Sequence, residues 1–320
     1  MDMHLGIEIG GTKLQLGVGH GRSAHIDDMV RTNVDVAAGA EGIVRQIETI
    51  GTELCEKFEI ASIGVGFGGP VNVATGQVTK SHQVSGWDGF PLGQRLRERF
   101  DRPVFVDNDC NAAALGEARL GAGKSAERVF YVTVGSGIGG GFVVSGQLDG
   151  NHRPAISEIG HLRPGLAASN TSDTVESLAS GWGIATQTRR HIAEAMAKGS
   201  PDRDLQELLE KCNHQPESLT TQQIGEAAGE GNAFAKSEIE AAARCLGWAV
   251  AQVISLLAPE MVVIGGGVSL LGNLFLDPVR RATEAYVFPP LLHSYAIEPA
   301  ALGEEVVVHG AIQLAVSTPR

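Results

Sequence analysis

The amino-acid sequence predicts an α/β fold in two domains, and three observations support this prediction. The chain has 320 residues, which is more than a single compact core usually holds. A strand, a glycine-rich turn and a second strand are expected at residues 4–19, and the pattern recurs about 125 residues later. After residue 172 the periodicity is mainly helical, interrupted by one short buried strand. The repeat supplies one strand–turn–strand unit to each expected domain.

Most elements are predicted by apolar residues at strand or helix spacing. Residues 41–58 carry apolar side chains at helical spacing, and Gly121 ends a helix over residues 110–120. The other expected helices span 174–198, 203–212, 220–230, 234–258 and 303–317. The expected strands span 4–9, 14–19, 61–66, 103–107, 129–134, 142–145 and 260–264.

Composition and charge exclude several classes of protein. The formal net charge is −12, whereas nucleic-acid binding needs a basic face. No apolar stretch is expected to span a membrane, and no signal peptide is expected at the N-terminus. The four cysteines are far apart and form no CxxC pair, so a reduced, cytoplasmic protein with free thiols is expected. They are Cys55, Cys110, Cys212 and Cys245.

The glycine clusters indicate phosphate binding. Glycine accounts for 42 residues, well above the average of about 7%. A glycine-rich turn points several backbone N–H groups at one ligand, and a side chain there would block phosphate oxygens. One such turn alone is more simply a tight hairpin, but two equivalent turns and a third cluster after a buried strand favour nucleotide binding. The expected ligands are Gly10, Gly11, Thr12 and Lys13, then Gly135, Ser136 and Gly137, then Gly265 and Gly266.

The second turn also matches the dinucleotide fingerprint GxGxxG, through Gly135, Gly137 and Gly140. That fingerprint must open a helix, because the pyrophosphate sits at the helix N-terminus. An apolar β-branched strand follows instead, so a dehydrogenase is a weak interpretation.

Taken in order, these motifs resemble the ROK family (repressor, open reading frame, kinase) of the actin-like ATPase superfamily. Gly6-Ile-Glu-Ile-Gly-Gly-Thr-Lys13 resembles the first phosphate motif, and Gly135-Ser-Gly-Ile-Gly-Gly-Gly141 resembles the second. Val262-Val-Ile-Gly-Gly-Gly-Val-Ser269 resembles the adenosine motif, and Gly310-Ala311 the closing segment. The resemblance implies a two-domain actin-like (ribonuclease H-like) fold with a cleft between domains. It also implies ATP and Mg²⁺ as cofactors and a free hexose as substrate.

A carboxylate is expected where a strand ends and a helix begins, at Asn108-Asp109. On its own, this pair is best explained as a helix cap. Phosphoryl transfer to an alcohol needs a group that accepts the hydroxyl proton and orients the oxygen, and a helix N-terminus favours the ionised base. The resemblance assigns Asp109 as the catalytic base and Asn108 as a sugar ligand.

The resemblance also implies a sugar pocket. Ser157-Glu158-Ile-Gly-His161 resembles the family's Gly-Glu-Ile-Gly-His segment, in which the Glu and the His contact sugar hydroxyls. Glu176 and Gly69 match two further sugar contacts. The plainer interpretations are a capping box of Asp173 with Glu176 and an ordinary hydrogen-bonded His161.

The chain departs from the family pattern at three places. Residues 162–175 contain no cysteine, whereas most members carry a three-cysteine zinc loop there, so no structural zinc is expected. Glu8 stands where Asp is usual, and it remains a carboxylate that can reach a Mg²⁺-bound water. His82 lies near a position that is often Asn or Thr, with an effect on hexose choice or none.

The leading hypothesis is an ATP-dependent hexose kinase of glucokinase type that acts at the 6-hydroxyl. A kinase for fructose, mannose or an N-acetylhexosamine such as N-acetylmannosamine stays open, as does a catalytically silent sugar-binding regulator. A ROK repressor needs an N-terminal helix-turn-helix, for which the start at Gly6 is expected to leave no room. The small domain is expected at 1–110 plus 298–320 and the large one at 111–297, in a homodimer or homotetramer.

Overall fold

The computed structural model describes residues 2–80, 84–150, 153, 155–199 and 202–316, and divides into two compact units. The first unit comprises Met1–Tyr131, Gly140–Ser157 and Ala300–Arg320, and the second comprises Val132–Gly139 and Glu158–Pro299. The expected boundary after residue 110 differs from this division, because residues 111–131 and 140–157 fall in the first unit.

A five-stranded sheet in the order β3-β2-β1-β4-β7 forms the centre of the first unit. β2 pairs antiparallel with β1 and β3, whereas β4 pairs parallel with β1 and β7. The carboxyl ends of the three parallel strands therefore meet at one edge of the sheet. The strands are β1 (Met3–Ile9), β2 (Lys13–Gly19), β3 (Asp28–Asn33), β4 (Ile60–Phe67) and β7 (Val104–Asn108). A small hairpin adds β5 (Val71–Asn72) and β6 (Gln77–Val78).

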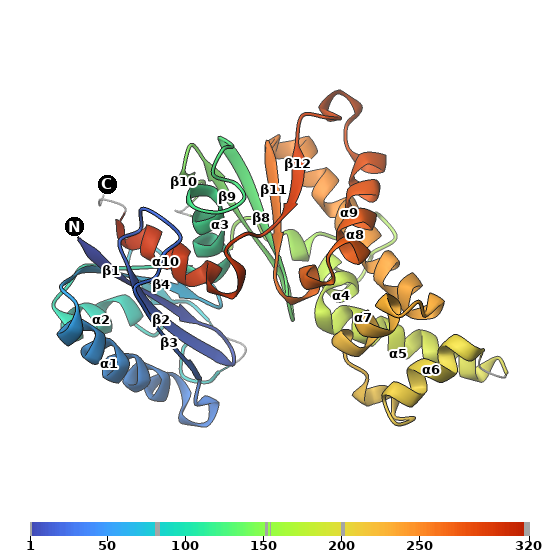
Figure 1. Cartoon of the computed structure of the whole chain (residues 1–320), viewed down its shortest axis with the longest axis horizontal. Helices are drawn as coiled ribbons and strands as arrows, with labels where there is room; N and C mark the ends of the chain where they lie inside the picture. The colour runs from blue at the N-terminus through green and yellow to red at the C-terminus, as the bar shows by residue number, and fades with distance from the viewer. Residues whose placement is uncertain (1, 81–83, 151–152, 154, 200–201, 317–320) are drawn as a thin grey trace. The chain divides into compact units, whose positions relative to one another are not determined.

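The two faces of this sheet are covered differently, as Figure 1 shows. Helices α1 (Gly39–Lys57) and α2 (Leu92–Phe100) lie on the side opposite α10 (Val306–Val316). Several strand residues on the α10 side are glycines: a Cβ on Gly6 would lie 2.5 Å from the Val308 carbonyl oxygen, and one on Gly64 would overlap the Ala311 carbonyl. At these positions the absence of a side chain lets the backbone of α10 contact the sheet directly.

Helix α3 (Asp109–Arg119) packs against the same closing helix α10. The crossing is close, because a Cβ on Gly310 would overlap the Ala112 carbonyl and one on Gly116 would lie 3.0 Å from the Gly310 nitrogen. This packing is the reason that α3 belongs to the first unit. The sequence expectation separated α3 from residues 1–110 because the contact with α10 is distant in sequence.

The second sheet has the order β10-β9-β8-β11-β12. Its strands are β8 (Arg128–Val134), β9 (Ile138–Val144), β10 (Gln147–Leu148), β11 (Met261–Gly265) and β12 (Ala296–Pro299). The glycine turn between β8 and β9 is shorter than expected: Gly139–Gly141 lie inside β9. Only Gly135, Ser136 and Gly137 remain in the turn.

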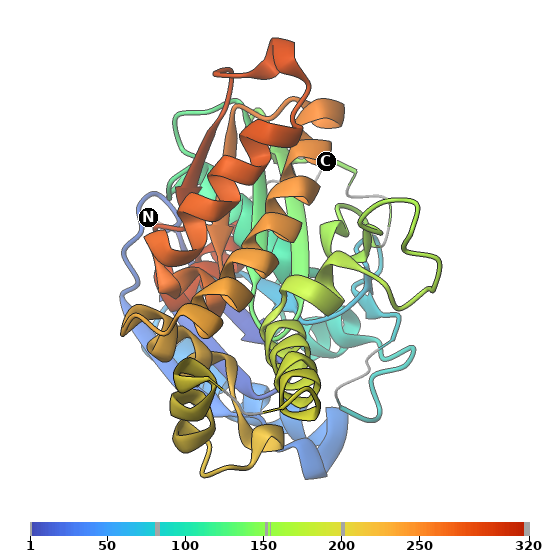
Figure 2. The same cartoon turned by 90° about the vertical axis from the view of Figure 1, so that its right-hand side faces the viewer.

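The second unit carries most of the helices, with α8 and α9 side by side (Figure 2). The expected helix 174–198 is two helices, because Ser180 has extended backbone angles and caps the second with its Oγ. The helices are α4 (Val175–Ala179), α5 (Gly181–Ala197), α6 (Arg203–Lys211), α7 (Thr221–Gly229), α8 (Ala233–Leu257) and α9 (Asn273–Tyr286).

Helix α8 is long and apolar enough, by length and composition alone, to cross a membrane. More than half of its apolar window is buried inside the structure, against α7 and α9 among others. Burial of this kind is typical of the core helix of a globular unit.

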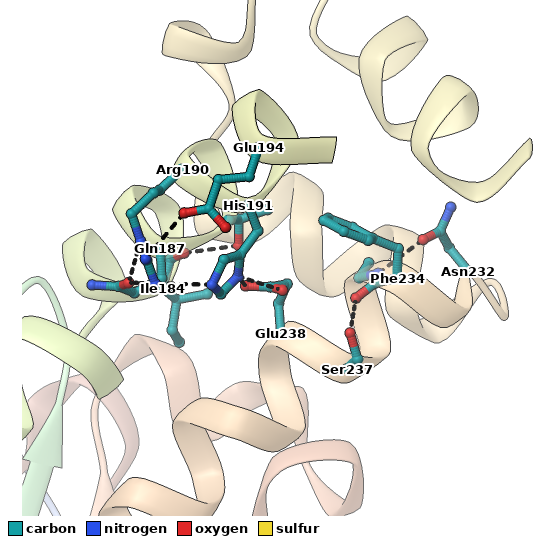
Figure 3. A network of polar contacts seen from close by, with 11 residues as sticks. Ile184, Gln187, Arg190, His191, Glu194, Asn232, Phe234, Ser237 and Glu238 are labelled. Carbon is teal, nitrogen blue, oxygen red and sulfur yellow. Dashed lines mark hydrogen bonds and ion pairs between the residues drawn. The ribbon is translucent and has the colours of Figure 1, made fainter. Parts of the chain in front are cut away.

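A polar cluster joins α5 to α8 (Figure 3). His191 Nδ1 lies 2.9 Å from both carboxylate oxygens of Glu238, whose exposure is only 9%. Arg190 Nη2 lies 2.9 Å from His191 Nε2 and Arg190 Nη1 lies 3.2 Å from Glu194. Since Arg can only donate, Nε2 accepts and Nδ1 donates to Glu238. The buried carboxylate is thus hydrogen-bonded, and the two helices are held together at this point.

Candidate active site

The first glycine turn joins β1 to β2 and leaves Thr12 exposed. The Gly10 N–H donates to the Lys13 carbonyl at 2.9 Å and closes the turn. Glu8, near the end of β1, lies 3.2 Å from Lys13 Nζ through Oε1. Burial raises the pKa of Glu8, and the neighbouring Lys13 ammonium acts in the opposite direction. The turn therefore presents a hydroxyl, a cation and a held carboxylate at one strand end.

Gln15, which no sequence motif indicates, holds the Glu8 carboxylate in place. Gln15 is fully buried, and its Nε2 donates to Glu8 Oε2 at 2.6 Å and to the Glu304 carbonyl at 3.0 Å. Its Oε1 accepts from Arg31 Nε at 2.8 Å, and Arg31 also pairs with Glu305. Glu304 and Glu305 lie in the 3-10 helix just before α10. Glu304 is 289 positions from Gln15, and Glu305 is 274 positions from Arg31, so no local pattern indicates these contacts.

The predicted base lies at the carboxyl edge of the same sheet. Asn108 is the N-cap of α3: its Oδ1 accepts from the Cys110 N–H at 2.8 Å, and its Nδ2 donates to the Gly69 carbonyl at 3.1 Å. Asp109 Oδ1 also accepts from the Cys110 N–H, at 2.9 Å. The structure thus brings together three of the predicted sugar-site residues, and capping and a functional role coexist at Asn108.

Burial raises the pKa of Asp109 to about 6, and the nearby Glu8 charge adds to the rise. Hydrogen bonding to Cys110 acts in the opposite direction. The helix start, which was expected to favour the ionised form, is therefore opposed by burial: desolvation of the charge outweighs the donors there.

Asp107 is a buried carboxylate for which no role was predicted. It is 2% exposed, and its Oδ1 accepts from the Asn108 N–H at 2.7 Å and from Asn111 Nδ2 at 2.8 Å. Burial raises its pKa to about 6. The spacing of an Asp and an Asn four residues apart across a helix start was the available signal. These bonds fix the first turn of α3 and hence the backbone of Asp109.

The second glycine turn lies in the second unit. The Gly135 N–H donates to the Gly137 carbonyl at 2.9 Å. Gly266 follows β11 with φ of 86°, and a Cβ there would lie 2.6 Å from backbone atoms of Val134. Glycine is thus required at this position by both conformation and space. The predicted cluster Gly265-Gly266 is consequently packed against the strand that leads into the turn.

A cavity of about 910 Å³ opens beside the second turn. It is lined by Gly135 and Ser136 of the turn, by Trp182 of α5, by Glu226 of α7, and by Leu270 and Leu271 of the 3-10 helix after β11. Mostly apolar walls with a few polar groups are typical of small-molecule sites. The cavity was not foreseen, because its walls come from four segments separated in sequence.

Three predicted sugar ligands lie together in the second unit. Glu158 precedes the 3-10 helix Ile159–His161, and both Glu158 and His161 are exposed. Although the residue as a whole is exposed, partial desolvation of its carboxyl group raises the pKa of Glu158. His161 opposes this rise and Glu176 adds to it. The preceding Ser157 has φ of 60°, a left-handed conformation that favours glycine. Residue 82 lies outside the described residues.

The alternative interpretation of Asp173 and Glu176 as a capping box is wrong. The N-cap of α4 is Thr174, and its reciprocal partner is Ser177. Asp173 instead accepts from the Asn170 N–H at 3.1 Å. Glu176 therefore takes no part in capping α4. Its Oε2 accepts a hydrogen bond from the Ile138 N–H at 2.8 Å.

Within the described residues, no group of three or more His, Cys, Asp and Glu side chains is placed to hold a metal ion. The four cysteines all lie within the described residues, and none of them forms a disulfide. The absence of structural zinc remains a prediction for metal analysis.

Matched glycine turns after the first strand of two sheets, a third glycine cluster and a carboxylate at a helix start define an actin-like ATPase fold. The chain belongs to the ROK family, whose sequence model matches residues 4–318. A glucokinase of Halalkalibacterium halodurans is 35% identical over 259 residues, covering 79% of this chain and 76% of that protein. A glucokinase of Thermotoga maritima is 30% identical over 314 residues, covering 97% and 96%. Xylose repressors are also related, at lower identity.

Solved structures agree with this assignment. A ROK family glucokinase from Streptomyces griseus, in complex with glucose and AMPPNP, superposes with a TM-score of 0.79 at 30% identity. The match covers 98% of this chain and 99% of that one. The α/β actin-like fold predicted from the sequence is thereby confirmed, and it contains two five-stranded sheets.

Proposed function

We propose that this protein is an ATP-dependent hexose kinase of glucokinase type, with Asp109 as the general base. The observation that supports this most strongly is the Asp109 carboxylate itself. It is held at the start of α3, beside Gly68 and Glu8, with a pKa near 6. A base with a pKa slightly below neutral is ionised in the cell and still attracts a proton.

Each unit would supply its own contacts to the nucleotide. In the first unit, the backbone N–H groups of Gly10–Lys13 would bind phosphate oxygens. In the second unit, those of Gly135–Gly137 would do the same, and the cavity beside them has ample volume for a purine nucleoside. Inorganic polyphosphate has no group to fill apolar walls, so the cavity supports a nucleotide as the donor.

Magnesium would be held through Glu8, whose carboxylate is fixed by Lys13 and Gln15. Mg²⁺ usually keeps several waters and uses few carboxylates, so one oriented Glu fits that demand. When bound, the ion would neutralise charge on the transferring phosphoryl group. Glu8 contributes orientation, and Lys13 adds a positive charge on the same side.

The proposed sugar ligands of the first unit are Gly69, Asn108 and Asp109. Those of the second unit are Glu158, His161 and Glu176. Carboxylates suit a sugar because each accepts from neighbouring hydroxyls. In the reaction, Asp109 would accept the proton of the attacking sugar hydroxyl. The hydroxyl oxygen would form a bond to the γ-phosphorus as the bond from that phosphorus to ADP breaks. The 6-hydroxyl is the expected acceptor.

A sugar-binding regulator is the second candidate, and the xylose repressors among the relatives support keeping it. Such a protein needs no raised carboxylate pKa and no nucleotide cavity, and this chain has both.

The experiment is ADP release from Mg-ATP with glucose, fructose, mannose, N-acetylglucosamine and N-acetylmannosamine. Turnover with glucose is expected. Sugar binding without turnover, by a folded protein with each of the five sugars, would favour the regulator.

A further inference from the structure

The Glu176 side chain connects the sugar site to the second glycine turn. One carboxylate oxygen, Oε2, accepts from the Ile138 N–H at 2.8 Å. Ile138 is the first residue of β9, immediately after the turn, and is 3% exposed. A carboxylate that accepts a backbone N–H makes a strong, charge-assisted hydrogen bond. Movement of the carboxylate therefore acts directly on the backbone that follows Gly137.

The same segment makes a second contact with the turn. The Gly181 N–H, at the start of α5, donates to the Gly135 carbonyl at 2.8 Å. A Cβ on Gly181 would lie 2.9 Å from that carbonyl oxygen, so glycine permits the approach. The next residue, Trp182, lines the cavity. Residues 176–182 therefore contact both ends of the turn.

The glycine at position 137 leaves the space that the Glu176 carboxylate occupies. A Cβ on Gly137 would lie 2.6 Å from Glu176 Oε2, which is too close for two nonbonded atoms. The second oxygen, Oε1, makes no hydrogen bond to any described residue, and the side chain is partly exposed. Glu176 thus holds the turn with one oxygen while the other remains an acceptor for a ligand.

We propose that Glu176 is a positioning residue that couples hexose binding to nucleotide binding. This inference rests on the proposed function, in which a sugar hydroxyl donates to Oε1. A bound sugar would fix the carboxylate, and the carboxylate would fix the Ile138 N–H and the turn that receives phosphates. Since such coupling is reciprocal, nucleotide would raise sugar affinity by the same factor.

The test is calorimetric measurement of glucose affinity with and without Mg-AMPPNP. In the wild-type protein the nucleotide should lower the Kd of glucose by a factor in the usual range of about 5–150. Gly137→Ala should displace the carboxylate without deleting it. It should weaken glucose binding even without nucleotide and bring the coupling factor close to one.

The matched control is Gly229→Ala, at the end of α7 in the same unit and outside the residues that line the cavity. A Cβ there has no neighbour within 4 Å, so this methyl should leave both glucose affinity and the coupling factor unchanged. Glu176→Asp, which shortens the side chain without adding atoms, should also reduce the coupling factor. It keeps the proposal testable if Gly137→Ala does not fold.

The outcomes separate this inference from the proposed function. If Gly137→Ala and Glu176→Asp both kept the wild-type coupling factor, the coupling role of Glu176 would be overturned, and the proposed function would stand. Loss of glucose affinity in Gly229→Ala equal to that in Gly137→Ala would also overturn it, because an unrelated methyl group would then have the same effect. Failure of the wild-type protein to bind any hexose would overturn the proposed function and the coupling together.

Discussion

The contact between α10 and the glycine face of the first sheet predicts a large effect of one methyl group. Gly6 lies in the middle of β1, and a Cβ there would lie 2.5 Å from the Val308 carbonyl oxygen and 2.8 Å from Ile312 Cγ1. Ordinary contact needs about 3.5 Å. In Gly6→Ala, helix and strand must therefore separate by about 1 Å, and a backbone carbonyl cannot rotate aside as a side chain can.

The cost follows from this overlap. Overpacking in a close-packed core costs about 1–3 kcal/mol, occasionally more, and a clash with backbone belongs at the upper end. About 3 kcal/mol corresponds to a fall in Tm of roughly 6–12 °C for a unit of this size, at about 2–4 °C per kcal/mol. Scanning calorimetry of the purified variant measures this shift.

The control is Gly229→Ala at the end of α7, where a Cβ meets nothing within 4 Å. An unchanged Tm, or a gain of up to about 1 kcal/mol from helix propensity, is expected there. A Gly6→Ala protein that melts with the wild type would refute the packing argument for the glycine face.

Three further predictions concern the site. Because the Asp109 base must be ionised and its pKa is raised to about 6, kcat/KM should fall about tenfold per pH unit below pH 6 and level off above it; a flat profile from pH 5 to 8 would contradict this role. Ser157→Gly should raise stability by about 1 kcal/mol, since residue 157 has φ of 60°, as chemical denaturation would show; a loss of stability would mean that the Ser side chain makes a necessary contact. Elemental analysis of the purified protein should find no stoichiometric zinc, because residues 162–175 lack cysteine; one zinc per chain would require a ligand set around His161 that the described residues do not form.

The sequence predicted features that depend on neighbouring residues. The glycine turns, the strand-to-helix junction at Asp109 and most helices lie within a few positions of their expected bounds. Helix α9 was missed because Pro278 lies inside it, and proline ordinarily ends a helical pattern. The capping box of Glu176 was wrong because Thr174, one position after Asp173, takes the cap.

Features that depend on distant segments were not predictable in this way. The bond from Glu176 to Ile138 spans 38 positions, and Gln15 reaches Glu304 over 289. Neither contact leaves a periodic signal in the sequence. The unit to which α3 belongs was not predictable either, because α3 packs against α10, which lies near the other end of the chain.

The most direct test of the central claim is the rate of ADP formation from glucose and Mg-ATP by Asp109→Asn, beside the wild type at pH 8. Glucose affinity of both proteins is measured in parallel. The account predicts a rate lower by about 10²–10⁴-fold, the usual contribution of a general base, while glucose still binds. A variant that turns over glucose at nearly the wild-type rate would show that Asp109 is not the base.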